Sequence, residues 1–274
     1  GDIRNIVRED MGKFHAEVQS KMLVMPLENY DHTSYADIEL NYTSLLKIVA
    51  SSKEMEAMVD AGMHGSMGGS SSTGGLVDQM SYLYGNNSRD LVANAFNPSF
   101  MDAVVDYGNG YAAGDVRALT LSLLNSTLQT LRTNGGTPKC ILTGYDTIQS
   151  LADLLQAQER FMERKEIVPT HNGVRGVKGR EVGFRVATYF DIPLIPCKDM
   201  SSTGEATGKL SDLLFLDTDH LWMAVMKPTQ YFEDGINSGN PFGVSALGNK
   251  AMFRTMGETG CTFFKGQGKI TNVN

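Results

Sequence analysis

Two glycine-rich stretches have the composition of a phosphate-binding loop: residues 68–75, and residues 204–209 with the sequence GEATGK. A P-loop needs the spacing G-x-x-x-x-G-K-[ST], so that backbone N–H groups and a helix N-terminus converge on phosphate oxygens. Gly204 and Gly208 are separated by one residue too few, and Leu210 stands where the hydroxyl residue belongs. We therefore predict no nucleotide site at either stretch.

Gly108, Asn109 and Gly110, followed by Gly114, form part of a dinucleotide-binding fingerprint. The full pattern G-x-G-x-x-G lies between a strand and a helix. No clear strand precedes Gly108 in the sequence, and the last glycine is misplaced. This stretch predicts a loop in front of a helix and not a cofactor site.

Metal-ligating and nucleophilic residues show no spacing that would build an active site. Asp217, Asp219 and His220 come closest to a ligand cluster, but two aspartates so spaced are typical of a tight turn, where their side chains bond the local backbone. No G-x-S-x-G motif is present, and no two carboxylates can be paired as acid and base from spacing alone. We expect no catalytic, cofactor-binding or metal-binding residues and no enzymatic activity. The histidines are scattered without an H-x-H or H-x-x-x-H pair: His15, His32, His64, His171 and His220.

The charge, the cysteine content and the hydropathy of the sequence argue against several further classes of protein. The 274 residues carry 24 Lys or Arg and 31 Asp or Glu, a net charge of −7, and they have no basic run of the kind that grips DNA phosphates. The densest basic cluster, from Arg160 to Arg180, is interrupted by glutamates and suits a solvated face or a subunit contact. The three cysteines suggest neither a disulfide framework nor a metal site and fit a reducing compartment. No apolar run approaches 18 residues, so we expect no membrane span.

Hydrophobic periodicity predicts several helices in the first half of the chain. Residues 1–25 carry an apolar stripe that a single helix cannot bury on itself, so we expect it to lie on another part of the fold or on a neighbouring subunit. A second helix is expected from Thr43 or Ser44 to Gly62, followed by a flexible loop at residues 62–75. A third is expected from Asn87 or Ser88 to Phe96, and a further helical turn or two at residues 99–107.

The second half begins with a long helix and continues mainly with strands. Residues 115–133 predict an amphipathic helix with Asp115 as N-cap and a leucine face that includes Leu124. A strand at residues 140–142 and a helix at 146–161 follow, then an exposed loop at 162–180 and an alternating strand at 182–190. The prolines of IPLIPC suggest an edge position or a bend. LLFLD and LWMAVM predict two strands, and AMFRTM and CTFFKG predict a hairpin around residues 257–260. The fold class is α+β in two lobes.

Four segments together resemble the major capsid proteins of tailed viruses with the Hong Kong 97-type fold. They are the long helix running into NGGTPKCILTGYDTIQSLADLL, then VGFRVATYFDIPLIPCKDM, LLFLDTDHLWMAVMKPTQYFEDG and AMFRTMGETGCTFFKGQGKI. The resemblance covers about residues 115–270. It implies an N-terminal arm at 1–41, an extended-loop region at 42–85, a peripheral domain with the spine helix at 86–137, an axial domain at 138–226, and a return to the peripheral domain at 227–274. The extended loop is usually a two-stranded ribbon, whereas residues 43–61 predict a helix.

The resemblance implies a structural protein whose main partner is itself, as pentamers and hexamers of an icosahedral shell. It also implies a place in the virion, assembly in the host cytoplasm, portal, scaffold or decoration proteins as further partners, and double-stranded DNA enclosed without sequence-specific binding. Two alternatives stay open: an encapsulin-like shell around protein cargo, and a soluble enzyme whose site is built from dispersed residues.

Overall fold

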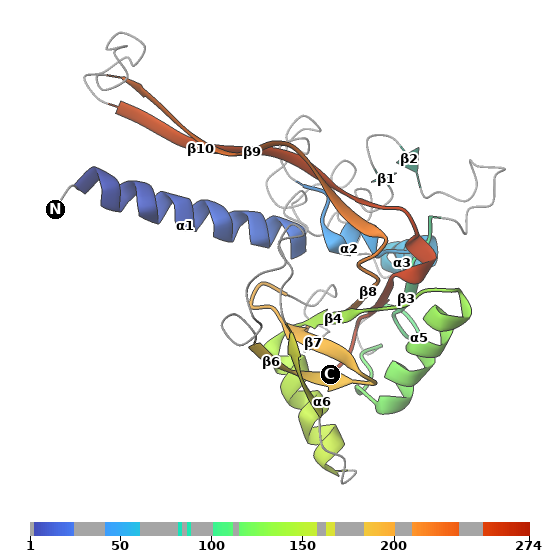
Figure 1. Cartoon of the computed structure of the whole chain (residues 1–274). Coiled ribbons are helices and arrows are strands. Elements are labelled where there is room, and N and C mark those ends of the chain that lie inside the picture. The colour runs from blue at the N-terminus through green and yellow to red at the C-terminus, as the bar shows by residue number, and fades with distance from the viewer. Residues whose placement is uncertain are drawn as a thin grey trace.

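The computed structural model describes residues 3–24, 42–60, 82–83, 87–88, 101–111, 115–157, 163–167, 184–200, 210–235 and 249–274. Figure 1 shows a body of sheet and helices from which a long two-stranded ribbon extends, with α1 beside it. The helices of these residues are α1 (Ile3–Val24), α2 (Leu45–Ile48), α3 (Ser52–Asp60), α5 (Leu121–Thr133), α6 (Tyr145–Ala157) and the 3₁₀ helix η5 (Phe264–Gly266). The strands are β1 (Tyr82–Leu83), β2 (Asn87–Ser88), β3 (Val104–Asp106), β4 (Cys140–Thr143), β5 (Glu163–Ile167), β6 (Phe184–Tyr189), β7 (Ile192–Pro196), β8 (Leu213–Leu216), β9 (Leu221–Gly235), β10 (Asn249–Cys261) and β11 (Gly268–Ile270).

A seven-stranded mixed sheet forms the centre of the body, in the order β3-β11-β8-β4-β7-β6-β5. β11 pairs parallel with β3 and antiparallel with β8, and β4 pairs antiparallel with β8 and parallel with β7. The strand nearest the C-terminus therefore lies inside the sheet, between strands that come from distant parts of the chain.

Helices cover both faces of this sheet. All four residues of β8 are buried, and successive side chains of a strand point to opposite faces. Leu213 and Phe215 pack in a cluster with leucines of α5 and α6, whereas Leu214 and Leu216 pack in a second cluster with α2 and α3. The molecule is thus a mixed α/β structure in three layers, and the uninterrupted run LLFL is typical of a strand with both faces covered.

A buried ion pair joins the second helical layer to the sheet. Lys269 Nζ of β11 lies 2.6 Å from Glu54 Oε1 of α3, and both side chains are fully buried. Tyr111 donates its hydroxyl proton to the same carboxylate oxygen (2.7 Å). Burial, reinforced by the Glu54 carboxylate, raises the pKa of the Tyr111 hydroxyl well above its usual value. Loss of either charge would leave the other uncompensated in the core, which is costly.

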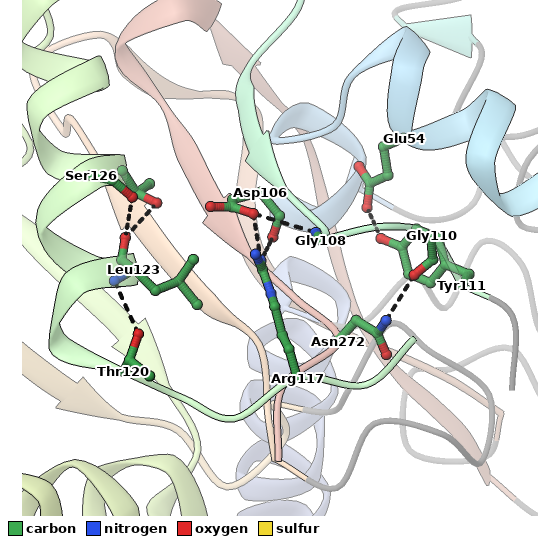
Figure 2. A network of polar contacts seen from close by, with 11 residues as sticks. Glu54, Asp106, Gly108, Gly110, Tyr111, Arg117, Thr120, Leu123, Ser126 and Asn272 are labelled. Atoms are coloured by element: carbon green, nitrogen blue, oxygen red, sulfur yellow. Dashed lines mark hydrogen bonds and ion pairs between the residues drawn. The ribbon is translucent and has the colours of Figure 1, made fainter. Parts of the chain in front are cut away.

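The long helix begins later than the sequence predicts. Thr120, not Asp115, is the N-cap of α5, and its hydroxyl oxygen accepts from the N–H of Leu123 (3.2 Å). Residues 115–120 run extended beside the C-terminal segment: Arg117 N–H donates to the Asn272 carbonyl, and Leu119 N–H donates to the Asn274 carbonyl. Figure 2 shows this segment with the bonds of Arg117 to Asp106. The final residues offer the backbone partners that the helix would otherwise supply, so the first turn and a half is extended.

Three further expectations about local structure are wrong. Residues 104–106, expected to be helical, form β3, and Asn87–Ser88, expected to begin a helix, form β2 in a small hairpin with β1. Residues 163–167, expected in an exposed loop, form β5 paired to β6. The expected helix after Thr43 is present as two short helices, α2 and α3, with Ser44 as the N-cap of α2. For β3 and β5 the strand partner lies outside the local window from which periodicity is judged.

Two further alternatives are wrong: the edge position for IPLIPC, which was expected to be at an edge or bent, and the turn at residues 257–260. β7 is not an edge strand, since it lies between β4 and β6. Its ladder with β6 covers only two residue pairs, so Pro196 lies beyond it. Residues 257–260 are not a turn but part of β10, which pairs without interruption at these residues with Trp222–Val225 of β9. β8 and β9 are strands as expected, but they belong to different sheets.

The other expected elements are confirmed: α1, α6, β4 and β6 all lie where periodicity places them. Within the described part of the chain, no helix has the length and apolar character needed to cross a membrane. The expected flexible loop at residues 62–75 lies outside the described residues.

The leucine face of α5 generates a stability prediction. Leu124 is fully buried in the cluster between α5, α6 and the sheet. We expect Leu124→Ala to lower the free energy of unfolding by about 2–5 kcal/mol, because it removes buried methyl groups and leaves a cavity. Gln129→Ala, on the exposed side of the same helix, is the control and should change little. Urea titration of the unassembled subunit measures both, and equal losses would contradict a buried leucine face.

Candidate functional site: the ribbon, its joint and helix α1

The joint between the sheet and the ribbon consists of two buried residues, Asp217 and Gln267. Asp217 follows β8 and Gln267 precedes β11, and these strands are antiparallel neighbours in the sheet. The N–H of Asp217 donates to Gln267 Oε1 (2.9 Å), and Gln267 Nε2 donates to the carbonyl oxygen of Asp217 (3.1 Å). The side-chain amide of Gln267 thus adds one further pair of hydrogen bonds to the β-ladder. It does so where the segments after β8 and before β11 leave the sheet for the ribbon.

The carboxylate of Asp217 ties the end of α5 to this joint. Its Oδ2 accepts from the N–H (3.1 Å) and the hydroxyl (3.3 Å) of Thr137, and its Oδ1 accepts from the N–H of Asp219 (3.3 Å). Gly136 and Gly266 lie so close that a Cβ on Gly136 would be 2.6 Å from the Cα of Gly266. Because only glycine permits this approach, the end of α5 rests directly on the backbone that leads to β11.

The ribbon consists of β9 and β10, paired from Leu221↔Cys261 to Gly235↔Asn249. The register shifts on both sides of Met256, and at each shift β9 has one extra residue, which is the mark of a β-bulge. Pro228 lies in one of these interruptions, where its missing N–H costs no ladder bond. The bulges and the proline bend and twist the ribbon while keeping it paired.

Two glycines of β10 allow close packing at the base of the ribbon. A Cβ on Gly257 would lie 2.7 Å from the carbonyl oxygen of Ala224, and the indole ring of Trp222 occupies the space above Gly260. Thr43 N–H also donates to Glu258 Oε1 (2.8 Å), which attaches the segment before α2 to the same place. The GETG sequence is therefore a packing site between strands.

Helix α1 lies along one face of the ribbon. The His15 ring stacks on Phe253 with 5.9 Å between ring centres, and His15 Nε2 lies 2.9 Å from Thr255 Oγ1. The Arg8 guanidinium is 5.7 Å from the centre of the Tyr231 ring. Phe253 and Tyr231 are a register pair, so they share one face of the ribbon. That face is covered by α1.

Among the residues that the structure describes, large apolar side chains stay exposed on the opposite face of the ribbon and on the outward side of α1. Phe232 and Met252 form the next register pair, which strand alternation places on the face away from α1, and they are 46% and 58% exposed. Of the twelve large exposed hydrophobic residues among the described ones, ten lie on α1 and the ribbon. Such a concentration marks a protein interaction surface, since isolated exposed apolar residues are normally scattered. The ten are Ile6, Val7, Met11, Phe14, Trp222, Met223, Val225, Met226, Phe232 and Met252.

The residues singled out for chemistry have structural roles where the structure describes them. Asp217 belongs to the joint, Asp219 pairs with Lys139 on the surface (2.5 Å), and the His220 ring packs edge-on against Phe263. Among the described residues, no three His, Cys, Asp or Glu side chains are grouped to hold a metal ion. Both phosphate-loop candidates, the basic side chains of residues 160–180 and three of the five histidines lie outside the described side chains.

The partial dinucleotide fingerprint is a turn. A strand, β3, does precede Gly108, contrary to expectation, but the chain that resumes at Asp115 is extended and not helical. Gly108 has φ +78° and its N–H donates to Asp106 Oδ1 (3.3 Å); Gly110 accepts from Asn272 Nδ2 (2.8 Å). The bond to Gly110 fixes the turn against the C-terminal segment, and the bond from Gly108 uses a backbone N–H of the kind that a cofactor phosphate would need.

None of the three cysteines forms a disulfide. Cys261 is buried, and Cys140 and Cys197 are half-buried at the edge of the second core cluster. Burial raises the pKa of the Cys140 thiol to about 11. A thiol with so high a pKa is a poor nucleophile at neutral pH.

Sequence analysis missed Gln267 and the glycine pairs. Gln267 lies in the run KGQGK, where glycines on both sides are a signal for close backbone approach. The same signal was present in GETG but was assigned to a turn. Neither pattern identifies its partner, because Asp217 and Trp222 are 50 and 38 positions away in the chain.

Comparison with known proteins gives one family. The family model for the SU10 major capsid protein matches residues 32–239, about three quarters of the chain. No curated protein matches the sequence. Among solved structures, the chain is similar to one from the holo-SrpI encapsulin complex of Synechococcus elongatus PCC 7942, with a TM-score of 0.42 and 14% sequence identity. That match covers 66% of this chain and 55% of the other, so it spans little more than half of the encapsulin-complex chain.

The joint generates a prediction with a matched control two residues away. We expect Asp217→Ala to lower the free energy of unfolding by about 1–3 kcal/mol, because the N–H groups of Thr137 and Asp219 lose their acceptor. Asp219→Ala breaks only an exposed pair with Lys139 and should leave stability within experimental error. Urea unfolding gives the two values, and hydrogen exchange should show faster exchange at the base of the ribbon for Asp217→Ala alone. Equal effects of the two variants would contradict the role given to the joint.

Proposed function

This chain belongs to the SU10 major capsid protein family, and we propose from that premise how its fold builds a shell. It is a major capsid subunit with a structural role, and it self-assembles in the capsid of the virion. We propose that it forms pentamers and hexamers, and that these close into the icosahedral head of a tailed double-stranded DNA virus. Assembly in the host cytoplasm is part of the same proposal.

One observation supports the assembly mechanism above the others: apolar side chains are gathered on the two elements that leave the body. A stable interface buries about 1,200–2,000 Å² in total. A 15-residue strand, its 13-residue partner and a 22-residue helix present enough length to reach more than one neighbour. Contacts divided among several neighbours can each be weak and still hold the whole shell together, while a misplaced subunit can dissociate.

We propose the Hong Kong 97-type arrangement for the domains. α5 is the spine helix of a peripheral domain at residues 86–137, and residues 138–226 form the axial domain, from which the chain returns at 227–274. Residues 1–41 are the N-terminal arm and 42–85 the extended-loop region. The joint supports a spine role for α5, since Asp217 connects the end of this helix to the ribbon. The proposed boundary at 226 falls inside the continuous strand β9.

The charge of the chain supports enclosure of DNA without binding to its sequence. At −7, the subunit carries no electrostatic attraction for phosphates as a whole. Portal, scaffold and decoration proteins are proposed as further partners at openings and surfaces of the shell. The contents of purified particles separate this proposal from its shell-forming alternative, since a viral head encloses nucleic acid and an encapsulin-like compartment encloses protein.

The uncovered face of the ribbon generates an assembly prediction. We expect Phe232→Ser with Met252→Ser to shift the purified protein from shells to free subunits or small oligomers, because the change removes apolar area that neighbours bury. Lys250→Gln, which strand alternation places on the same face of β10 as Met252, is the control and should still form shells. Sedimentation velocity and negative-stain electron microscopy measure the outcome.

Circular dichroism and thermal melting of the free subunits check that the double variant is folded. Both side chains are about half exposed in the single chain, so the melting temperature should hardly move. A wild-type protein that stays a monomer at every salt concentration and pH would contradict the proposed function and favour the alternative of a soluble enzyme. A double variant that forms shells as readily as wild type would show that this face is not an interface.

A further inference from the structure

A groove runs along the C-terminal half of α5, on the side of the helix that faces the β6–β7 turn. Its volume is about 420 Å³, and its lining is Asn125, Leu128, Gln129, Arg132, Thr133 and Phe190. Leu128 is almost fully buried and belongs to the core cluster between α5, α6 and the sheet, so it forms an apolar floor. Arg132 is an exposed cation in the last turn of α5. The groove thus combines an apolar base with one positive charge.

Phe190 stands beside this groove in a conformation that aromatic residues rarely adopt. Phe190 and Asp191 occupy the β6–β7 turn with φ of +49° and +66°, a pair of left-handed residues of the type that tight hairpins need. Asn and Gly are the usual occupants, and a bulky side chain there is strained. The ring is nevertheless 59% exposed and is held edge-on by Tyr189, whose hydroxyl donates to Asn125 Oδ1 (2.7 Å). The fold therefore fixes an aromatic ring beside the groove at a conformational cost.

The outward side of α1 has the complementary pattern. Ile6, Asp10 and Phe14 are spaced at i, i+4 and i+8, which aligns them on one side of the helix over about 12 Å at 1.5 Å per residue. The 3.6-residue period puts this row on the side opposite to Arg8 and His15, which contact the ribbon. Ile6 and Phe14 are 57% and 68% exposed, and Asp10 is exposed between them.

We propose that the row Ile6, Asp10 and Phe14 of one subunit docks in the α5 groove of a neighbouring copy of this chain. The Asp10 carboxylate pairs with the Arg132 guanidinium, and Ile6 and Phe14 pack against Leu128 and Phe190. An acidic residue between two apolar ones meets a groove that combines a basic residue, an apolar floor and an aromatic ring, so both the charge and the hydrophobicity of the two surfaces match. This proposal rests on the proposed shell function and specifies one of its contacts.

The groove cannot be filled by α1 of the same chain. Figure 1 shows α1 beside the ribbon at one side of the molecule, whereas α5 lies at the other side of the body. His15 and Arg8 hold α1 on the ribbon, and Val24 at its end is buried in the core cluster with α2 and α3. With both ends of the helix held, α1 cannot reach its own α5 without leaving the ribbon and the core cluster. A second copy is the occupant that the charge pattern and this geometry favour.

A charge-exchange experiment tests the pair directly. Asp10→Arg and Arg132→Glu each place like charges in contact, and we expect each to raise the protein concentration needed for half-maximal shell formation by about tenfold or more. The double variant restores an opposite-charge pair and should return within about twofold of wild type. Light scattering against protein concentration gives the thresholds, and electron microscopy confirms that the particles are shells.

Glu9→Arg is the matched control, since it makes the same charge change one residue away. Glu9 lies on the flank of α1, where it pairs with Lys13 (2.9 Å). We expect Glu9→Arg to assemble like wild type. Equal damage from Glu9→Arg and Asp10→Arg, normal assembly of both charge-reversed single variants, or failure of the double variant to recover would each overturn the proposed contact. Wild-type protein that forms no shells would instead contradict the proposed shell function itself.

Phe190→Asn provides a second readout that separates docking from folding. Asparagine accepts positive φ more readily than phenylalanine, so the melting temperature of the free subunit should stay equal or rise. Shell formation should nevertheless need a higher protein concentration, because the neighbour loses the ring. A lower melting temperature with unchanged assembly would show that Phe190 packs only within its own chain and would count against the proposal.

Discussion

The pairing of β8 with β11 is the interaction on which both the body and the ribbon depend. These short strands lie in the interior of the sheet, and each continues outward, as β9 and β10 respectively. The direction of the ribbon is therefore set by two strands that are fully buried, with Asp217 and Gln267 adding the rung at the exit. The pair of Lys269 with Glu54 holds β11 from the second helical layer. An exposed arm of this length needs such a base, since a two-stranded hairpin by itself is marginal in water.

The ribbon and α1 bury only part of their apolar surface against the rest of the described chain. α1 covers one face of the ribbon through an aromatic stack and a few polar contacts. Val24 holds its C-terminal end in the core, whereas the pair of Glu17 with Lys198 is exposed on both sides. Exposed pairs of this kind contribute little. In the proposed shell a neighbour covers the remaining apolar face and the outward row of α1, and burial of these side chains lowers their free energy. Assembly thus completes the burial that folding begins, which connects the fold of the subunit to the function of a shell protein.

Sequence reasoning succeeded where structure is decided locally and failed where it is decided by a distant partner. The leucine spacing of α5, the apolar stripe of α1 and the buried run of β8 carry their own signal. By contrast, residues 115–120 are extended because the C-terminal residues bond to them, and GETG is a strand because β9 lies opposite. The same division applies to the candidate site. The apolar stripe predicted that α1 lies on another surface, but no local sequence feature identifies Asp217 as the partner of Gln267. Two aspartates in a turn have the same spacing whether they bind a metal, cap a turn or anchor a ribbon.

The distribution of charge explains why contacts through extensions suit this subunit. α1 and the two ribbon strands carry seven Lys or Arg and six Asp or Glu, a net charge of +1, which leaves −8 on the rest of a chain of −7. The other residues that the structure describes carry 11 Lys or Arg and 15 Asp or Glu, a net charge of −4. Bodies with this charge repel one another at close range, whereas a nearly neutral, apolar arm does not repel a neighbouring body. Repulsion between bodies and attraction through arms act at different places on the surface.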